Sequence, residues 1–365
     1  MPFGLRWFRK HLPCLPCCKT PVDQCQLPKC VVDNVLPTAT CGTYRIDLCV
    51  DDETFLDTTE PLDDDQETRS ITFVCISDTH SKHNSIPLPD DPNYILIHTG
   101  DFSDRTNGVT DFNTWLGTLP YKEKIVIAGN HEVQLSTDVA QAKAQLSNCT
   151  YLCDSATTVE GVQLFGSPHH PKRGCCYRRD AFGAVDQARS QVFQKVPKGC
   201  HLLLSHCPPF GIRDEEILRD SLAHVGCGHC LKAIQRIKPH AVVFGHCHQW
   251  RGVSRMWHDG GQVREETKSN GNSRSSNDKG TTTTHNHNQE EIIAPSTIQI
   301  ELSSTTGKTK YRRRSSAHSA SSLLVNAASI QNDEAEACGG VAPPILIEFI
   351  FHRVSAAEKE LVGIV

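Results

Sequence analysis

The sequence predicts an α/β fold in which short buried strands alternate with helices. Five short apolar runs lack the alternation of a half-exposed strand, which indicates strands buried on both faces. They are residues 71–77, 94–98, 124–128, 200–205 and 241–244. Helical patterns at residues 111–116, 138–146, 180–195 and 228–237 lie between or before the runs. This alternation of strand and helix is typical of α/β domains.

The length and composition allow a sizeable folded core. The chain has 365 residues, of which 38% are hydrophobic, and this is enough for one large or two ordinary domains. Its formal net charge of −5 and its sequence pI near 6.4 differ from the basic surface that DNA- or RNA-binding domains carry. We therefore expect no polymeric nucleic acid partner.

Composition divides the chain into four segments. Residues 1–68 are rich in Cys and basic side chains and then become acidic, which predicts a flexible tail. Residues 69–257 hold the predicted strands and helices of the folded domain. Residues 258–321 are rich in Ser, Thr, Asn, Lys and His, so we expect a disordered insertion. Within residues 322–353, the apolar runs 323–326 and 345–350 predict strands that return to the same sheets.

Most of the apolar runs are followed directly by a polar motif. Because ligands of α/β sheets gather beyond the carboxyl ends of the strands, these motifs are expected to share one crevice. Each is common in loops by itself, but together they supply the carboxylate, amide and imidazole ligands that suit a pair of divalent cations. The motifs are Asp78-Thr79-His80, Gly100-Asp101, Gly129-Asn130-His131-Glu132, His206 and Gly245-His246-Cys247-His248.

The residue types suggest separate tasks within such a site. Asp78 and His80 are two residues apart just after a strand, where one turn can aim both at the same cation. Asp101 has two carboxylate oxygens and can bridge two cations. Asn130 offers a neutral amide oxygen as a ligand, and the next imidazole, that of His131, can remain off the metals and act on the substrate.

This ordered set resembles the calcineurin-like metallophosphoesterase superfamily, whose pattern Asp-x-His, Gly-Asp, Gly-Asn-His, His, Gly-His-x-His is matched here with every ligand present. The resemblance covers residues 71–257 and the C-terminal strands. It implies a four-layer α/β/β/α sandwich of two mixed sheets flanked by helices. Five stretches look like the metallophosphoesterase domain-containing branch of class III phosphodiesterases, namely residues 73–80, 96–102, 125–132, 166–168 and 325–327.

The resemblance also implies a division of the ligands. One cation would bind Asp78, His80 and His248, the other would bind Asn130, His206 and His246, and Asp101 would bridge them. Asn130 and His131 would contact the substrate, and His131 would protonate the leaving group or hold the phosphate. We expect Mn²⁺ first, with Fe, Zn²⁺ or Mg²⁺ as alternatives. The implied reaction is attack of a metal-bridging hydroxide on a phosphate ester, with a small phosphodiester such as a cyclic nucleotide as the favoured substrate.

Two other functions stay open at this point. A protein Ser/Thr phosphatase would share several motifs, but such phosphatases place a Gly where Ser81 follows His80 and an Arg where Ala128 precedes Gly-Asn-His. A metal- or nucleotide-binding scaffold with low turnover is the third hypothesis. The segment 166–171 contains His169 and His170 where relatives commonly carry an aromatic residue, which bears on substrate preference.

The remaining cysteine and N-terminal signals concern location. The 18 cysteines are scattered rather than spaced as in a small secreted disulfide scaffold, so we expect reduced thiols. The N-terminus has no uncharged apolar stretch of signal-peptide type, and a cytoplasmic protein is expected. Cys14, Cys17 and Cys18 in a basic tail suggest S-palmitoylation and peripheral membrane contact. The motif Cys227-Gly228-His229-Cys230 lacks a thioredoxin-like context and is not expected to be a redox site.

Overall fold

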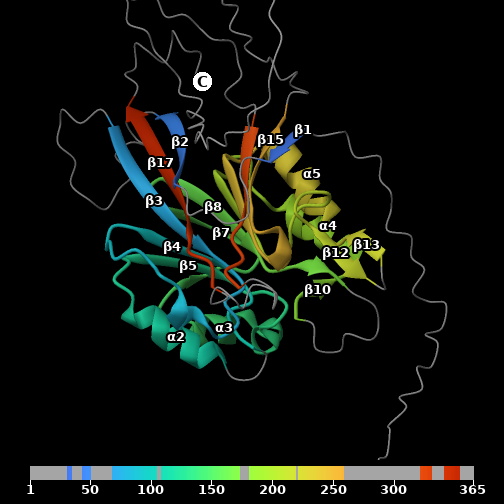
Figure 1. The fold of residues 1–365 in the computed structure, drawn as a ribbon, viewed down its shortest axis with the longest axis horizontal. Coiled ribbons are helices and arrows are strands. Elements are labelled where there is room, and N and C mark those ends of the chain that lie inside the picture. Colours follow the sequence, from blue (N-terminus) through green and yellow to red (C-terminus); the bar gives the residue numbers. More distant parts are fainter. Residues whose placement is uncertain are drawn as a thin grey trace, which may run out of the picture.

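The computed structural model describes residues 31–34, 43–50, 68–104, 108–172, 181–218, 221–258, 321–330 and 341–353. These residues form two packed sheets with helices on their outer faces (Figure 1). Within this part of the chain, no helix combines the length and apolarity needed to cross a membrane. The expected insertion at 258–321 and the cysteines expected to be palmitoylated lie almost wholly outside the described residues.

The first sheet has six strands in the order β2-β17-β3-β4-β5-β6. Strands β3 to β6 are parallel, and β17 runs antiparallel to β3 and parallel to β2. The strands are β2 (Thr43–Val50), β3 (Thr68–Ile76), β4 (Ile95–Thr99), β5 (Glu123–Ile127), β6 (Thr150–Tyr151) and β17 (Ile345–Arg353). The mixed sheet therefore has a parallel centre whose strands end at the same edge.

The second sheet has seven strands in the order β1-β15-β16-β14-β11-β8-β7. Its centre, β16-β14-β11-β8, is parallel, whereas β15, β1 and β7 are added antiparallel. The strands are β1 (Val31–Asn34), β7 (Ser155–Val159), β8 (Val162–Ser167), β11 (Leu202–Ser205), β14 (Ala241–Phe244), β15 (Gly252–Trp257) and β16 (Ser321–Asn326).

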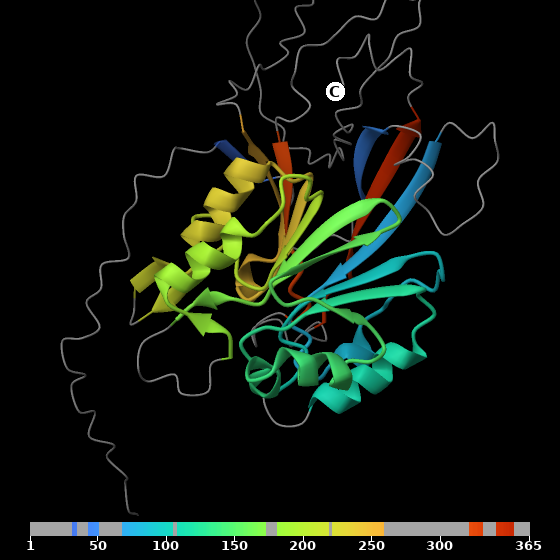
Figure 2. The ribbon, with the colours of Figure 1, turned by 180° about the vertical axis from the view of Figure 1, so that it is seen from behind.

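Helices cover the outer face of each sheet (Figures 1 and 2). α2 (Gly108–Thr118) and α3 (Val139–Gln145) lie on the first sheet, and α4 (Asp186–Gln194) and α5 (Gly228–Ile237) lie on the second. The Asp138 side chain caps α3 by accepting the N–H groups of Ala140 and Gln141. α5 ends at Lys238, whose φ of 55° is left-handed, as is common at helix C-termini.

The core explains why the strands are apolar throughout. In β3, Phe73 and Cys75 point into the cluster between the sheets, while Val74 and Ile76 point toward α2 and α3. In β11, Leu204 belongs to the cluster between the sheets and Leu203 to the cluster under α4 and α5. Each central strand is buried on both faces, so the predicted α/β/β/α fold of two mixed sheets is confirmed.

Shorter elements lie around the strand ends. They are the 3-10 turns η2 (His83–Ser85), η3 (Val133–Ser136) and η4 (His248–Trp250), the pair β9 (His170–Pro171) with β10 (Gly183–Ala184), and the hairpin β12 (Glu215–Leu218) with β13 (Ser221–His224). The hairpin and both short strands were not predicted from the sequence.

Two predictions need correction. The flexible tail predicted for residues 1–68 is wrong for two segments, because β1 pairs with β15 and β2 pairs with β17. The helix predicted over 180–195 is shorter, since α4 begins at Asp186 after the short strand β10. Of the two strands expected at the C-terminal end, β16 joins the second sheet beside β14 and β17 joins the first beside β3. The remaining domain boundaries stay predictions.

Candidate metal centre

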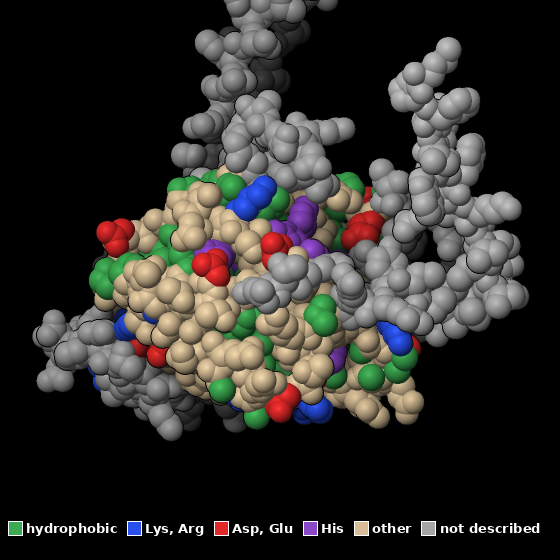
Figure 3. All heavy atoms as spheres, turned by 90° about the horizontal axis from the view of Figure 1, so that it is seen from below, with side chains coloured by type: hydrophobic (Ala, Val, Ile, Leu, Met, Phe, Trp, Pro, Cys, Tyr) green, Lys and Arg blue, Asp and Glu red, His purple; other side chains and the backbone are tan. Residues whose placement is uncertain are grey.

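The predicted motifs meet at the edge where the parallel strands of both sheets end. Strands β3, β4 and β5 deliver the first three motifs, and β11 and β14 deliver His206 and the Gly-His-Cys-His segment. The loops are joined by backbone hydrogen bonds, with the Asp78 N–H on the Gly100 carbonyl at 2.9 Å and the Gly245 N–H on the His206 carbonyl at 3.1 Å. Figure 3 shows histidine side chains gathered on this face, with carboxylates around them.

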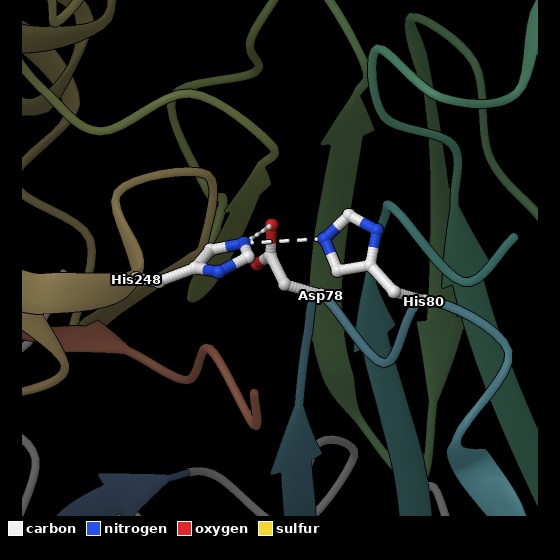
Figure 4. A group of neighbouring side chains, drawn as sticks. All are labelled: Asp78, His80 and His248. Carbon is white, nitrogen blue, oxygen red and sulfur yellow. Dashed lines mark hydrogen bonds and ion pairs between the residues drawn. The ribbon is translucent and has the colours of Figure 1, made fainter. Parts of the chain in front are cut away.

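Asp78, His80 and His248 form the first donor group. One donor atom of each lies within 4.8 Å of the others. The Nε2 atom of His248 is 3.3 Å from Asp78 Oδ1 and 3.2 Å from His80 Nε2 (Figure 4). Asp78 is fully buried. This is the set of side chains that the sequence analysis assigned to one cation.

Asp101, His206 and His246 form the second donor group, again with donor atoms within 4.8 Å of one another. His206 Nε2 is 3.0 Å from Asn130 Oδ1, 3.2 Å from His246 Nδ1 and 3.5 Å from Asp101 Oδ1. The other ring nitrogen of His206 donates to the Thr99 carbonyl at 2.9 Å. That hydrogen bond turns the Nε2 lone pair toward the group.

Asp101 lies between the two groups. It also falls in a third cluster with His80 and His131, whose donor atoms are within 4.8 Å of one another. His131 borders the groups: its Nε2 is 3.8 Å from Asp101 Oδ2, and its ring centroid is 4.5 Å from that of His80. All eight predicted site residues are therefore brought together, although their roles stay predictions.

The backbone at the site is strained. Asp78, His80, Asp101 and His246 have φ values of 53°, 40°, 53° and 69°, in the left-handed region that non-glycine residues seldom adopt. Such strain persists only where surrounding contacts hold it, and it gathers at functional sites. Here the His246 N–H donates to both carboxylate oxygens of Asp78, at 2.9 and 3.0 Å.

Two glycines leave room for the carboxylates. A Cβ at Gly245 would overlap Asp78 Oδ2 and Ser77 Oγ, and a Cβ at Gly129 would overlap Asp101 Oδ1. These glycines are required by close approach rather than by turn geometry. A glycine is thus required for steric reasons at the first position of both motifs, Gly-Asn-His and Gly-His-x-His.

Glu132 organises two of the loops, a role that the sequence analysis did not assign. Its buried carboxylate accepts the N–H groups of Asp101, Ser103 and Gly129 at 2.7–2.9 Å, and the Ser103 hydroxyl at 2.9 Å. Burial, reinforced by the nearby Asp101 charge, raises the pKa of Glu132 to about 7. The position of Glu132 directly after Gly-Asn-His was a signal for a role at the site. Sequence spacing alone does not reveal which backbone N–H groups its carboxylate accepts.

The charges of the groups favour a cation between them. Burial alone would raise the pKa values of Asp78 and Asp101, but His248 and His206 beside them hold both below the ordinary range. Burial would lower the pKa of His206, yet the carboxylates of Asp101 and Asp78 raise it to about 10. A proton on His206 thus balances buried negative charge, and a divalent cation can take that place.

The donor set also fits cations geometrically. Two ligand nitrogens on one metal at about 2.0–2.1 Å lie roughly 3.0–3.4 Å apart. The facing nitrogens of His80 and His248, and those of His206 and His246, are each 3.2 Å apart. The mixture of carboxylate, amide and imidazole donors suits Mn²⁺, Fe or Zn²⁺. The described residues therefore fit two cations that share Asp101.

The cysteines near the site are not among the donor groups. Cys207 and Cys247 are buried, and the Cys207 thiol contacts the carbonyls of Pro208 and Val225. Cys227 and Cys230 are also buried, which raises the pKa values of both thiols, so they are poor nucleophiles. This supports the prediction that the Cys-x-x-Cys motif is no redox site.

The two unexpected histidines occupy different surroundings. His169 lies 3.1 Å from Asp154 Oδ2 and 3.0 Å from the Phe182 carbonyl, away from the donor groups. The His170 ring stacks on His246, with centroids 5.7 Å apart. His170 therefore packs against a metal-group side chain, while His169 ties the β8–β9 segment to a neighbouring loop.

Known proteins are similar to the part of the chain that carries these motifs. The family described as Calcineurin-like phosphoesterase matches residues 71–250. UPF0046 protein C25E10.12 of Caenorhabditis elegans is 36% identical over 206 residues, covering 50% of this chain and 71% of that protein. Human Metallophosphoesterase domain-containing protein 1 is 36% identical over 207 residues, covering 50% of this chain and 61% of that protein.

A further relative and a solved structure are also similar to this chain. UPF0046 protein K07C11.7 of Caenorhabditis elegans is 34% identical, and the match spans 65% of that protein, so the chain spans under two thirds of several curated relatives. Among solved structures, the protein TT1561 of Thermus thermophilus aligns with a TM-score of 0.37 and 11% identity, over 49% of this chain and 82% of that chain. By its motifs and its relatives, this chain belongs to the calcineurin-like phosphoesterase family.

Proposed function

We propose that this protein is a metal-dependent phosphodiesterase that acts on a small phosphodiester, with cyclic nucleotides as the first substrates to test. The observation that carries the proposal is the position of Asp101, which belongs to the second donor group and also clusters with His80 of the first. A pair of cations about 3.5–4 Å apart is the arrangement used for in-line displacement at phosphorus. We propose Mn²⁺ as the first choice.

The chain's own residues prepare the site for this chemistry. When bound, the two cations would neutralise phosphate oxygens and lower the pKa of a water molecule. Asp78, Asp101, the amide oxygen of Asn130 and the four imidazoles of His80, His206, His246 and His248 would hold them. Thr99 and Glu132 keep His206 and the Asp101 loop in place through the hydrogen bonds described above.

His131 is placed to act on the leaving group. Its side chain is 23% exposed, whereas that of His206 is fully buried. The backbone N–H of His131 donates to Asp101 Oδ1 at 2.8 Å, which fixes the residue beside that carboxylate. A shallow pocket lined by Ser103, Gly108 and Gln134 adjoins it, between the start of α2 and η3. An imidazole at such an edge can donate a proton to a departing alkoxide, which contributes about 10²–10⁴-fold to the rate.

Charge favours a diester over a monoester. Three carboxylates, those of Asp78, Asp101 and Glu216, lie in or beside the groups and offset most of the charge of two divalent cations. A diester carries one negative charge, whereas a monoester carries nearly two at neutral pH. Among the described arginines, Arg213 and Arg251 bind backbone carbonyls of neighbouring segments instead of facing the groups.

A substrate panel tests the proposal. Purified protein loaded with Mn²⁺ is assayed on bis-p-nitrophenyl phosphate, p-nitrophenyl phosphate, and 2′,3′- and 3′,5′-cyclic nucleotides. The proposal predicts that the diesters are preferred and that a chelator abolishes turnover. Preference for the monoester would instead identify a phosphatase. Binding of metal with no turnover on any substrate would identify a scaffold, and either result overturns the proposal.

A further inference from the structure

The hairpin β12–β13 lies against the segment that carries His246 and His248. The Glu215 carbonyl accepts two hydrogen bonds from η4, one from Trp250 Nε1 at 2.8 Å and one from Gln249 Nε2 at 2.6 Å. The base of the hairpin is itself closed by buried Asp214, whose Oδ2 accepts the N–H groups of Gly211 and Gly226 at 2.9 and 3.0 Å. The hairpin is therefore tied both to its own loop and to the ligand segment.

Glu216 reaches from this hairpin to a metal-group histidine. Its Oε1 atom is 3.8 Å from His246 Nε2 and also 3.8 Å from Cys247 Sγ. The carboxylate is partly exposed, at 19%, while Cys247 is buried. Glu215, its neighbour in β12, points the opposite way because successive strand residues face opposite sides, and its carboxylate lies 4.0 Å from His224 Nε2.

Neighbouring groups hold the His246 residue in its orientation. Its Nδ1 faces His206 Nε2 at 3.2 Å inside the second donor group. Its Nε2 faces Glu216, its backbone N–H is held by Asp78, and His170 stacks on its ring. Only Nδ1 is placed to be a ligand, so the proton of the neutral ring belongs on Nε2, toward the carboxylate.

We infer that Glu216 is a positioning residue for His246: its carboxylate accepts the Nε2–H and holds the Nδ1 lone pair on the second cation site. Ligand histidines usually donate their other N–H to a carboxylate or a carbonyl, which fixes the tautomer and raises the basicity of the ligand. The Thr99 carbonyl does this for His206. The two atoms are 3.8 Å apart, so this hydrogen bond requires the carboxylate to approach Nε2 to about 2.7–3.2 Å.

The inference rests on the proposed metal centre, but it does not depend on the substrate. Loss of a partner of this kind typically lowers metal affinity about 10–100-fold. Because Glu216 lies beside only one of the two groups, the loss should fall on one of two binding events. The site of Asp78, His80 and His248 should keep its affinity.

Calorimetric titration of chelator-stripped protein with Mn²⁺ tests this. We expect Glu216→Ala to weaken one of two binding events by about 10–100-fold. Glu216→Gln, whose amide oxygen still accepts a hydrogen bond without the charge, should fall between Ala and the parent. The matched control is Glu215→Gln, which removes the same charge from the same strand on the other face and should leave both events unchanged.

A second measurement separates positioning from damage to the hairpin. In Zn²⁺-loaded protein labelled with ¹⁵N-histidine, the parent should show a slowly exchanging proton on His246 Nε2, and Glu216→Ala should lose that protection while melting within about 2 °C of the parent. Unchanged affinity in Glu216→Ala, or an equal loss in Glu215→Gln, would overturn the inference. If metal binding depends on Glu216 but the protein hydrolyses no diester, only the proposed function is overturned.

Discussion

Replacing Gly245 by alanine should damage the metal centre through a single added methyl group. The new Cβ would overlap Asp78 Oδ2 and Ser77 Oγ, and both residues are fully buried. Asp78 cannot move without releasing the His246 N–H that its two oxygens accept. The site is therefore overpacked and this hydrogen bond is lost, so the first donor group opens.

The size of the effect follows from two contributions. Overpacking of a buried site costs about 1–3 kcal/mol, and loss of a hydrogen bond to a charged group costs about 1.5–3 kcal/mol. The free energy of unfolding should therefore fall by roughly 2.5–6 kcal/mol, which for a domain of about 200 residues corresponds to a melting temperature lower by roughly 5–24 °C. Mn²⁺ affinity at Asp78, His80 and His248 should fall with it.

Gly228→Ala is the control for this experiment. Gly228 is the first residue of α5, and a Cβ there would meet nothing within 4 Å. Because alanine favours helix over glycine by up to about 1 kcal/mol, this variant should melt at or above the parent temperature. Thermal denaturation and Mn²⁺ titration of both variants provide the comparison. A Gly245→Ala protein that melts with the parent and binds Mn²⁺ equally well would refute the steric reasoning.

Two further predictions concern the buried groups. Asp101→Ala should lose bound metal and turnover together, whereas His131→Ala should keep its metal and lose about 10²–10⁴-fold in turnover; metal content measured beside activity checks this, and a metal-free His131→Ala would contradict the assignment. Burial lowers the pKa of His98 from 6.5 to about 3, so the folded protein keeps this ring neutral while the unfolded chain gains a proton below pH 6.5. Metal-free protein should therefore lose up to about 1.4 kcal/mol of stability per pH unit between pH 6 and 4 from this group. Denaturant titrations at several pH values should show that the free energy of unfolding falls less steeply with decreasing pH in His98→Asn than in the parent.

The central strands and the ligand set could be predicted because their signals are local. Strands such as β14, Ala241–Phe244, and helix α5, Gly228–Ile237, have the predicted boundaries, since burial on both faces leaves an unbroken apolar run. The donor side chains follow these strands directly, so a correct strand assignment already places them at one edge of the sandwich. The division into two donor groups came from the family resemblance and stays a prediction.

Other features depend on contacts between distant segments. β2 pairs with β17 about 300 residues later, and Arg45 meets Glu348 across that pair at 2.8 Å. The alternation of Tyr44, Ile46 and Leu48, which pack on the central cluster, was a signal for a half-buried strand that the acidic surroundings obscured. Glu216 carries no such signal, because only the folded hairpin brings it to His246.

The most direct test of the central claim is anomalous diffraction from crystals of the full chain grown with Mn²⁺. We expect two anomalous peaks: one among Asp78, His80 and His248, the other among Asn130, His206 and His246, with Asp101 contacting both. A single peak, or peaks away from these side chains, would contradict the claim that this fold assembles a two-cation centre around a shared carboxylate.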